Sequence, residues 1–161
     1  MAHPETRVGH IHLTVSSLTR SLEFYRDLLG FEISARYGES AVFLSAGGYH
    51  HHIGLNTWAG VGATGAPAGH TGMYHVAFLY PNRRELAMVV QNLLAASYPI
   101  DGLADHGVSE AIYLRDPDGN GVELYVDRPK AQWEVDNDGL FEMVTEPLDL
   151  QSLLRALDDT V

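Results

Sequence analysis

Side chains that can do chemistry are concentrated between His106 and Glu123. This stretch reads His-Gly-Val-Ser-Glu-Ala-Ile-Tyr-Leu-Arg-Asp-Pro-Asp-Gly-Asn-Gly-Val-Glu, and it combines an imidazole, the phenol of Tyr113 and a carboxylate. Imidazole and phenol groups can hold or transfer protons, and a carboxylate can also bind a metal ion. For Glu123, two interpretations are open from this stretch alone: a solvated side chain on a half-exposed strand, or a metal ligand.

Two tightly joined strands are expected to position these side chains. The sequence Asp-Pro-Asp-Gly at 116–119 favours a turn, because proline presets its own φ and glycine tolerates a positive φ. We expect strands over 111–115 and 121–127. In the second strand, the period of two puts Glu123 and Tyr125 on one face and the aliphatic side chains on the other.

The elements around this stretch occur twice along the chain. The first set is a strand over 8–15, an amphipathic helix that ends at Gly30, and strands over 31–37, 41–45 and 49–56. The second set is a strand over 72–80, a helix over 84–96, a short strand over 100–107 and the two strands given above. A stretch rich in glycine and alanine at 59–72 has no periodicity and indicates a linker or loop. The order predicts an α+β fold of two paired βαβββ modules, at 7–58 and 72–128.

The two modules can be aligned residue by residue. The Gly-His opening of the first module matches Tyr-His in the second, which places His10 over His75. The Ala-Val-Phe-Leu strand of the first module matches Ala-Ile-Tyr-Leu of the second, and one added residue in the following turn places His52 over Glu123. A pseudo-twofold axis between the modules would bring these four positions together in one curved mixed sheet.

Two imidazoles and one carboxylate, from His10, His75 and Glu123, form the ligand set of a facial triad, which leaves adjacent coordination positions open on the ion. We therefore expect the curved sheet to surround a catalytic metal site. Imidazole suits Fe, Mn, Ni and Zn alike, so the ligand types do not select the ion. The chain has no cysteine, which excludes thiolate ligands, disulfides and cysteine nucleophiles.

The opening stretch resembles the signature of the type I extradiol ring-cleavage dioxygenases, in the spacing of His106, Ile112-Tyr113, Asp116-Pro117, Gly119 and Glu123. One outer position departs from that signature, because Ala104 stands two places before the histidine, where other residue types are usual. The paired modules and the Gly-His opening resemble the wider vicinal oxygen chelate superfamily, which includes glyoxalase I, methylmalonyl-CoA epimerase and bleomycin-resistance proteins. This resemblance covers roughly residues 7 to 128.

The resemblance implies that His10, His75 and Glu123 bind Fe(II), with Mn(II), Ni(II) or Zn(II) as alternatives. It also implies a small catechol-type aromatic diol as the substrate, which is opened with O2. His12 lies on the ligand face, where we expect a packed imidazole or a partner of a ligand side chain rather than a pocket wall.

Three further residues receive roles from the same resemblance. His52 matches the acid-base histidine, which would take a phenolic proton and return it during ring opening, as suits a group that titrates near neutrality. His106 and Tyr113 match positions that hydrogen-bond the substrate oxygens and the reduced oxygen. His50 and His51 are expected to be loop neighbours of this set.

Two other functions remain open. A non-redox lyase or isomerase, of the glyoxalase or epimerase kind, would stabilise an enediolate on Ni, Co or Zn, but such sites usually place Glu or Gln where His52 stands. A metal-free protein that binds a drug between the modules generally lacks the ligand set found here. The extradiol dioxygenase is therefore the predicted enzyme.

Composition bounds the remaining possibilities. The 161 residues suffice for one domain, over 1–128, followed by a tail over 129–161 with a short helix over 148–157. The formal charge of −11, from 10 basic and 21 acidic residues, argues against nucleic acid or an anionic membrane as a partner. No apolar run is long enough for a membrane span and the N-terminus lacks a signal-peptide core, so we expect a cytoplasmic protein.

Familiar extradiol enzymes of this type are longer and carry more modules. The substrate walls that extra sequence supplies in them must come here from the loop over 59–72, the tail or a second subunit. We therefore expect a homodimer or a higher homo-oligomer.

Overall fold

The computed structural model describes residues 1–65, 67 and 69–158, and it divides into two compact units, 1–71 and 72–161. Each unit holds one strand–helix–strand–strand–strand module, which confirms the α+β class and the predicted repeat. The strands belong to two mixed sheets, one in each unit. No helix within the described ranges is long and apolar enough to cross a membrane.

The first unit contains a four-stranded sheet with the order β1-β4-β3-β2. Its elements are β1 (Ile11–Thr14), α1 (Leu18–Leu22), which continues as the π-helical turn η1 (Glu23–Leu28), β2 (Glu32–Tyr37), β3 (Ala41–Ser45) and β4 (Ile53–Asn56). β1 pairs with β4 in parallel and the other pairs are antiparallel. β4 begins later than the predicted strand over 49–56, so the histidines at 50–52 precede the strand. Among the described residues of 59–72 there is no helix or strand, as predicted.

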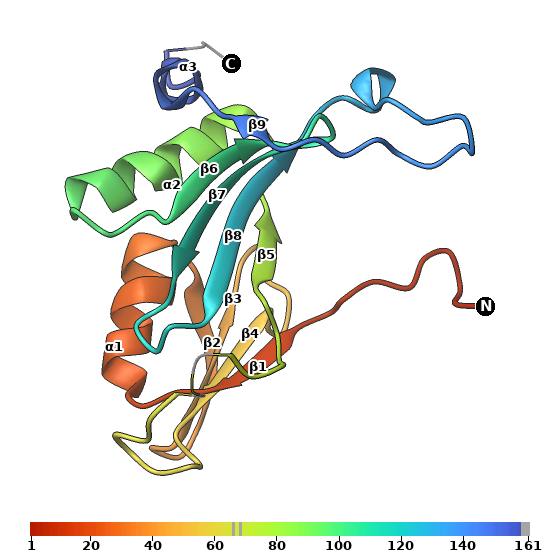
Figure 1. Cartoon of the computed structure of the whole chain (residues 1–161). Coiled ribbons are helices and arrows are strands. Elements are labelled where there is room, and N and C mark those ends of the chain that lie inside the picture. Colours follow the sequence, from red (N-terminus) through yellow and green to blue (C-terminus); the bar gives the residue numbers. More distant parts are fainter. Residues whose placement is uncertain (66, 68, 159–161) are drawn as a thin grey trace. The chain divides into compact units, whose positions relative to one another are not determined.

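The second unit contains a five-stranded sheet with the order β5-β8-β7-β6-β9, and α2 lies along it (Figure 1). Its elements are β5 (Val76–Leu79), α2 (Arg83–Ala95), β6 (Gly102–Asp105), β7 (Ser109–Arg115), β8 (Gly121–Asp127), the short 3₁₀ turn η2 (Lys130–Gln132), β9 (Glu146–Pro147) and α3 (Leu150–Arg155). β5 and β8 are parallel neighbours, although α2, β6 and β7 separate them in the chain. The sequence therefore folds back so that two distant strands lie side by side.

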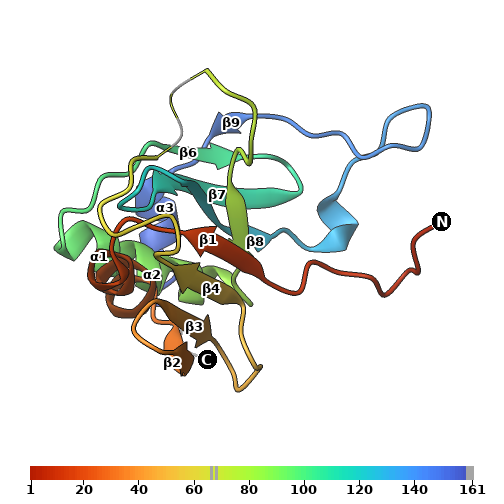
Figure 2. The ribbon, with the colours of Figure 1, turned by 90° about the horizontal axis from the view of Figure 1, so that it is seen from below.

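Local chemistry explains where α2 begins and which face it buries. The Asn82 side chain accepts a hydrogen bond from the backbone N–H of Glu85 at 2.9 Å, which satisfies one of the free donors at the helix start. Leu86, Val90 and Leu93 recur at helical spacing and are fully buried. This apolar stripe packs α2 into the core of the second unit, and Figure 2 shows the helix from below.

Besides η2, the tail contributes a strand and a helix to the second unit. β9 pairs with β6 and becomes the outer strand of the sheet, while α3 packs against α2. The sequence predicted the helix, which the structure shortens to six residues, but not the strand. A two-residue strand that contains a proline has no periodicity to detect.

The strand register corrects one part of the predicted alignment. His12 pairs with Gly54 in the first unit, as Ala77 pairs with Glu123 in the second. The antiparallel neighbours agree, since Phe43 pairs with Gly54 as Tyr113 pairs with Glu123. The residue equivalent to Glu123 is thus Gly54.

The predicted match of His52 with Glu123 is therefore wrong by two positions. It placed an added residue in the turn of the second module, whereas the register shows that the loop between the paired strands is one residue longer in the first module, where β4 begins only at Ile53. A side chain at Gly54 has no space, since a Cβ atom there would lie 2.9 Å from the ring of His12. In the first unit, a histidine ring from the neighbouring strand fills the position that a carboxylate holds in the second.

Candidate active site

In the second unit, three neighbouring strands bring the side chains of His75, Tyr113 and Glu123 together. Glu123 lies on β8 directly opposite Tyr113 on β7, and His75 immediately precedes β5. The Nε2 atom of His75 lies 2.9 Å from Oε2 of Glu123, and the Tyr113 hydroxyl lies 3.1 Å from Oε1 of the same carboxylate. Glu123 is only 8% exposed, which rules out the interpretation of a solvated strand residue.

His106 extends this arrangement from the turn after β6. Its Nε2 atom lies 2.7 Å from the Tyr113 hydroxyl, and its Nδ1 atom lies 2.7 Å from the carbonyl oxygen of Val144 in the tail. His75, Glu123, Tyr113 and His106 thus form a continuous series of polar contacts, here called the polar chain. Four of the six predicted site residues belong to it.

The charge on Glu123 is not balanced by a basic side chain. Its oxygens contact His75 and Tyr113, and no arginine or lysine within the described ranges pairs with it. The Nδ1 atom of His75 is buried without a hydrogen-bond partner in the same described part of the chain. A buried carboxylate needs a compensating charge, so this end of the polar chain is suited to a bound cation.

Tyr113 is held in its protonated form. Burial raises the pKa of the Tyr113 hydroxyl to about 12, and the nearby negative charge of Glu123 adds to the effect. At neutral pH this residue therefore acts as a hydrogen-bond donor.

A close approach of two strands sets the distance between His75 and Glu123. A Cβ atom at Gly121 would lie 2.1 Å from the carbonyl oxygen of Tyr74 and 3.1 Å from Cα of His75. Only glycine fits at this position, because any side chain would push apart the start of β8 and the entry to β5.

The first unit carries His10 and places it against His51. The two rings have centroids 4.4 Å apart, and His51 also contacts Phe43 at 5.0 Å. Burial lowers the pKa of His51, and repulsion from the neighbouring histidines lowers it further. The sequence predicts only that His51 is a loop neighbour of the site residues. Its ring contact with His10 distinguishes it from His50 and His52.

His52 and His12 have other surroundings. The Nδ1 atom of His52 lies 3.3 Å from both the Ser45 hydroxyl and the backbone N–H of Ala46. His12 packs its ring against Phe43 and Trp58, with centroid distances of 5.7 and 5.3 Å, and is the packed imidazole that was expected. Within the described part of either unit, no three His, Asp or Glu side chains gather to hold an ion.

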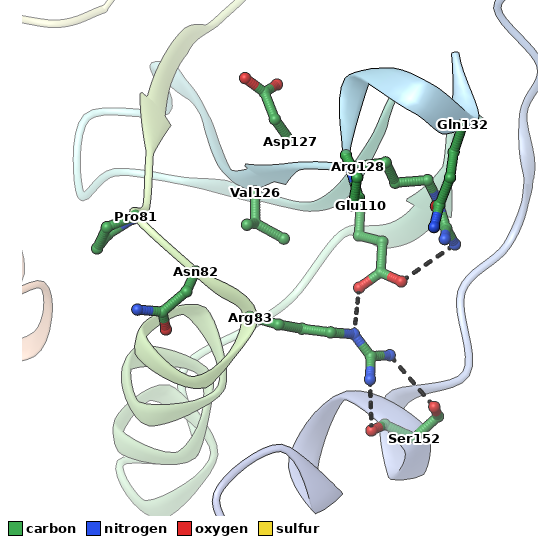
Figure 3. A pocket seen from close by; sticks show the side chains of 10 residues that line it. Pro81, Asn82, Arg83, Glu110, Val126, Asp127, Arg128, Gln132 and Ser152 are labelled. Carbon is green, nitrogen blue, oxygen red and sulfur yellow. Dashed lines mark hydrogen bonds and ion pairs between the residues drawn. The ribbon is translucent and has the colours of Figure 1, made fainter. Parts of the chain in front are cut away.

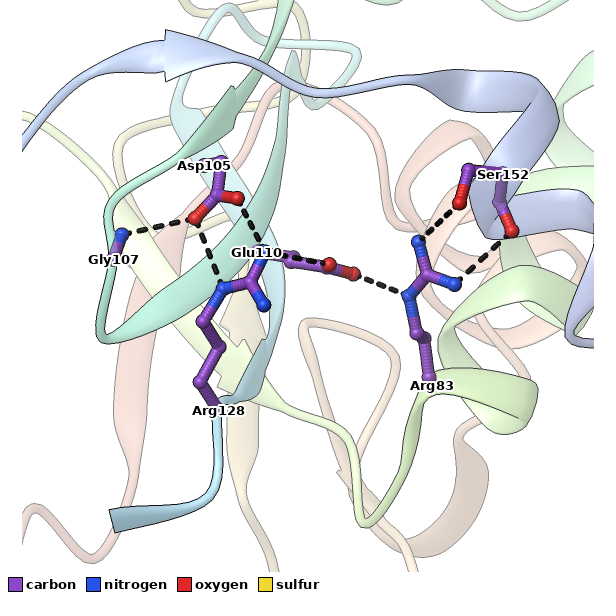
Figure 4. Close-up of polar contacts among 6 residues, drawn as sticks. All are labelled: Arg83, Asp105, Gly107, Glu110, Arg128 and Ser152. Atoms are coloured by element: carbon purple, nitrogen blue, oxygen red, sulfur yellow. Dashed lines mark hydrogen bonds and ion pairs between the residues drawn. The ribbon is translucent and has the colours of Figure 1, made fainter. Parts of the chain in front are cut away.

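A pocket of about 700 Å³ lies on another part of the second unit, between α2, β8 and α3 (Figure 3). Its arginines are already bonded to carboxylates, as Figure 4 shows. The Nε atom of Arg83 lies 2.6 Å from Glu110, and its other nitrogens reach Ser152. Arg128 pairs with Glu110 and with Asp105, the residue before His106. We interpret this cluster as a support for the strands rather than as a substrate site.

The comparisons with known proteins agree with the fold. The model of the Glyoxalase/Bleomycin resistance protein/Dioxygenase superfamily matches residues 7–124. The chain therefore belongs to this superfamily.

Among individual relatives, the catechol-2,3-dioxygenase of Bacillus subtilis (strain 168) is 38% identical over 158 residues, which are 98% of this chain and 54% of that protein. Biphenyl-2,3-diol 1,2-dioxygenase 3 of Rhodococcus globerulus is 31% identical over 122 residues, 75% of this chain and 63% of that protein. The chain thus spans about half of the length of the first relative and less than two thirds of the second.

Among solved structures, a lactoylglutathione lyase from Agrobacterium tumefaciens superposes with a TM-score of 0.59 at 23% identity, over 77% of this chain and 96% of that one. This similarity supports the fold alone.

Proposed function

We propose that the protein is an extradiol ring-cleavage dioxygenase that opens a small catechol-type diol with O2. The polar chain is the observation that carries this proposal. It brings into contact the three signature residues His106, Tyr113 and Glu123, and it adds His75 at the carboxylate. The names of the relatives from Bacillus subtilis and Rhodococcus globerulus support the same chemistry.

The residues of the second unit fit a divalent cation. Two ligand atoms that sit at right angles around one ion, each at about 2.1 Å, are about 3 Å apart. His75 Nε2 and Glu123 Oε2 are 2.9 Å apart, and the carboxylate has no basic partner among the described residues. His10 as the third ligand rests on the sequence alignment and the resemblance. Fe(II) is the proposed ion, with Mn(II) as the first alternative.

A divalent cation held by His75 and Glu123 would supply a Lewis acid that makes the diol easier to deprotonate. The protein side chains then control protons and orientation. Because the pKa of Tyr113 is about 12, its hydroxyl keeps its hydrogen at neutral pH. It can therefore donate a hydrogen bond to an oxygen that gains negative charge. His106, which contacts Tyr113, can orient that hydroxyl and exchange a proton with the substrate.

The acid-base histidine is proposed to lie in the run that precedes β4. His52 is the residue that the resemblance assigns, but its Nδ1 is engaged with Ser45 and Ala46. His51 is the member of the run that packs on His10. Separate substitutions of His51 and His52 would therefore distinguish the two candidates.

Oxygen uptake tests the proposal directly. Protein loaded anaerobically with Fe(II) is mixed with a panel of catechols, while oxygen and absorbance are recorded together. We expect oxygen consumption and a yellow ring-opened product. Iron-loaded protein that consumes no oxygen with any catechol would contradict the proposal, and turnover of a thiohemiacetal under the same conditions would favour a glyoxalase-like lyase.

A further inference from the structure

The tail is bonded to His106 through both its backbone and its ring. The backbone N–H of Val144 donates to the carbonyl oxygen of His106 at 3.2 Å, and the carbonyl of Val144 lies 2.7 Å from Nδ1 of the ring. β9 continues this contact, because it pairs with β6 at Ala104 and Asp105. The segment 142–147 therefore runs alongside the strand that presents His106.

The carbonyl of Val144 determines which ring nitrogen carries the hydrogen. A carbonyl oxygen can only accept, so the 2.7 Å contact requires a hydrogen on Nδ1. The Thr145 hydroxyl, 3.5 Å from the same nitrogen, is too distant to compete and can act as donor or acceptor. In the neutral ring, Nε2 then carries a lone pair and faces the Tyr113 hydroxyl as an acceptor.

The hydroxyl of Tyr113 has a single hydrogen and two acceptors within reach. One is Nε2 of His106 at 2.7 Å and the other is Oε1 of Glu123 at 3.1 Å. With the hydrogen on Nδ1 of His106, Tyr113 can donate to the closer acceptor and leave the Glu123 oxygen free. With the opposite tautomer, the ring would donate to Tyr113, whose hydrogen would then point only at Glu123.

We propose that the C-terminal segment 142–147 is a positioning element of the site. Through the carbonyl of Val144 it holds His106 as the Nδ1–H tautomer and thereby sets the direction of hydrogen bonding along the polar chain. The structural part of this inference is independent of the reaction, and its effect on turnover rests on the proposed dioxygenase function.

Nitrogen NMR of the histidine rings tests the tautomer. Metal-free protein of residues 1–161 labelled with ¹⁵N is measured at a pH where the rings are neutral, and His106 is assigned by comparison with His106→Gln. We expect the His106 signals of an Nδ1–H ring. An Nε2–H ring in the wild-type protein would overturn the proposal without any variant.

Two substitutions at one position separate the backbone contact from the side chain. Val144→Pro removes the N–H that anchors the segment to His106, whereas Val144→Ala keeps it. We expect the Nε2–H form of His106 to become populated in Val144→Pro and to stay absent in Val144→Ala. An unchanged Nδ1–H ring in folded Val144→Pro would show that the tail does not set the tautomer.

Turnover of the iron-loaded variants gives the second readout. Val144→Pro should retain its iron and lose about 10- to 100-fold in kcat, as expected for a displaced proton-handling group. Val144→Ala should remain within about twofold of wild type. A wild-type protein without dioxygenase activity would refute the proposed function, yet the NMR result would still decide the role of the tail.

Discussion

At the scale of single residues, the members of the polar chain could be named from the repeat and from a family signature, but the neighbours that tune it could not be predicted. His106, Tyr113 and Glu123 lie close together in sequence, so the alternation of one hairpin was enough to bring the last two face to face. Val144 acts through its backbone carbonyl, which leaves no signal in the side-chain type. His51 and His52 are adjacent, and only folded contacts separate their surroundings.

Removal of the Glu123 carboxylate should abolish tight metal binding. Glu123→Ala deletes a ligand and leaves an empty space beside His75 and Tyr113, so we expect iron content below about a tenth of wild type after dialysis. Atomic absorption on the dialysed protein measures this. The exposed Glu39 provides a control, and Glu39→Gln should retain its iron. Full iron content and activity in Glu123→Ala would contradict the proposed ligand set.

The two adjacent histidines before β4 should differ in their effect on turnover. A group that moves protons contributes about 10²- to 10⁴-fold to a rate, so a phenylalanine at the acid-base position should retain metal and lose turnover to that extent. Steady-state rates and iron content of His51→Phe and His52→Phe identify the residue. A large loss in His51→Phe alone would move the assignment away from His52, and small losses in both would exclude the run from proton transfer.

At the scale of elements, a partly buried ion cluster joins α2, β6, β7, the end of β8 and α3. Glu110 lies between Arg83 and Arg128, and Asp105 closes the cluster beside the turn that carries His106. The helices and most strands could be predicted from periodicity and capping residues. The cluster could not, since its members are far apart in sequence and no local pattern relates them.

Loss of Glu110 should destabilise the second unit. Its side chain is 7% exposed, whereas those of Arg83 and Arg128 are 37% and 30% exposed, so water can compensate part of the uncovered positive charge. We expect Glu110→Ala to cost about 2 to 3 kcal/mol, somewhat below the range for fully buried pairs. Urea denaturation measures this cost. Asp27→Ala breaks the exposed pair with Arg26 and should leave the urea midpoint close to that of the wild type.

The same cluster should make stability depend on acid pH. The hydrogen bond from Arg128 lowers the pKa of Asp105, so the folded state holds its proton less tightly than the unfolded state. The resulting stabilisation is present above the unfolded pKa of about 4 and is lost as the pH falls through the lower folded pKa.

Unfolding free energies measured from neutral to acid pH reveal this contribution. Asp105→Asn should be less stable than wild type at pH 7, and the difference should shrink as the pH falls below about 4. A constant difference over that range would exclude ionised Asp105 as its source. Asp101→Asn, which removes an exposed pair with Arg115, should follow the wild-type curve.

At the scale of the whole molecule, the chain carries one pair of modules and spans about half of its Bacillus subtilis relative. The duplication was visible in the order of elements, and the structure confirms it. The register between the two modules could not be obtained from residue types. An alignment that matched a histidine to a carboxylate placed His52 opposite Glu123, whereas the strand pairing makes Gly54 the equivalent residue.

The proposed homodimer is tested by the mass of the protein in solution. A pocket wall that one pair of modules does not supply would come from a second copy, so we expect about twice the mass of the 17.7 kDa chain. Light scattering coupled to gel filtration measures it. A single-chain mass at every concentration would require the loop or the tail to complete the wall instead.

The parallel pairing of β5 with β8 also has a consequence for the order of folding. It joins Val76 to Val122 across α2, β6 and β7, and therefore closes a long loop, whereas β7 and β8 meet through a short turn. Loop-closure entropy favours the hairpin first and the edge strand later. His75 thus reaches Glu123 only when most of the second unit has already formed. A cation would therefore bind this pair of ligands at the end of folding, and it would stabilise the folded structure rather than nucleate its formation.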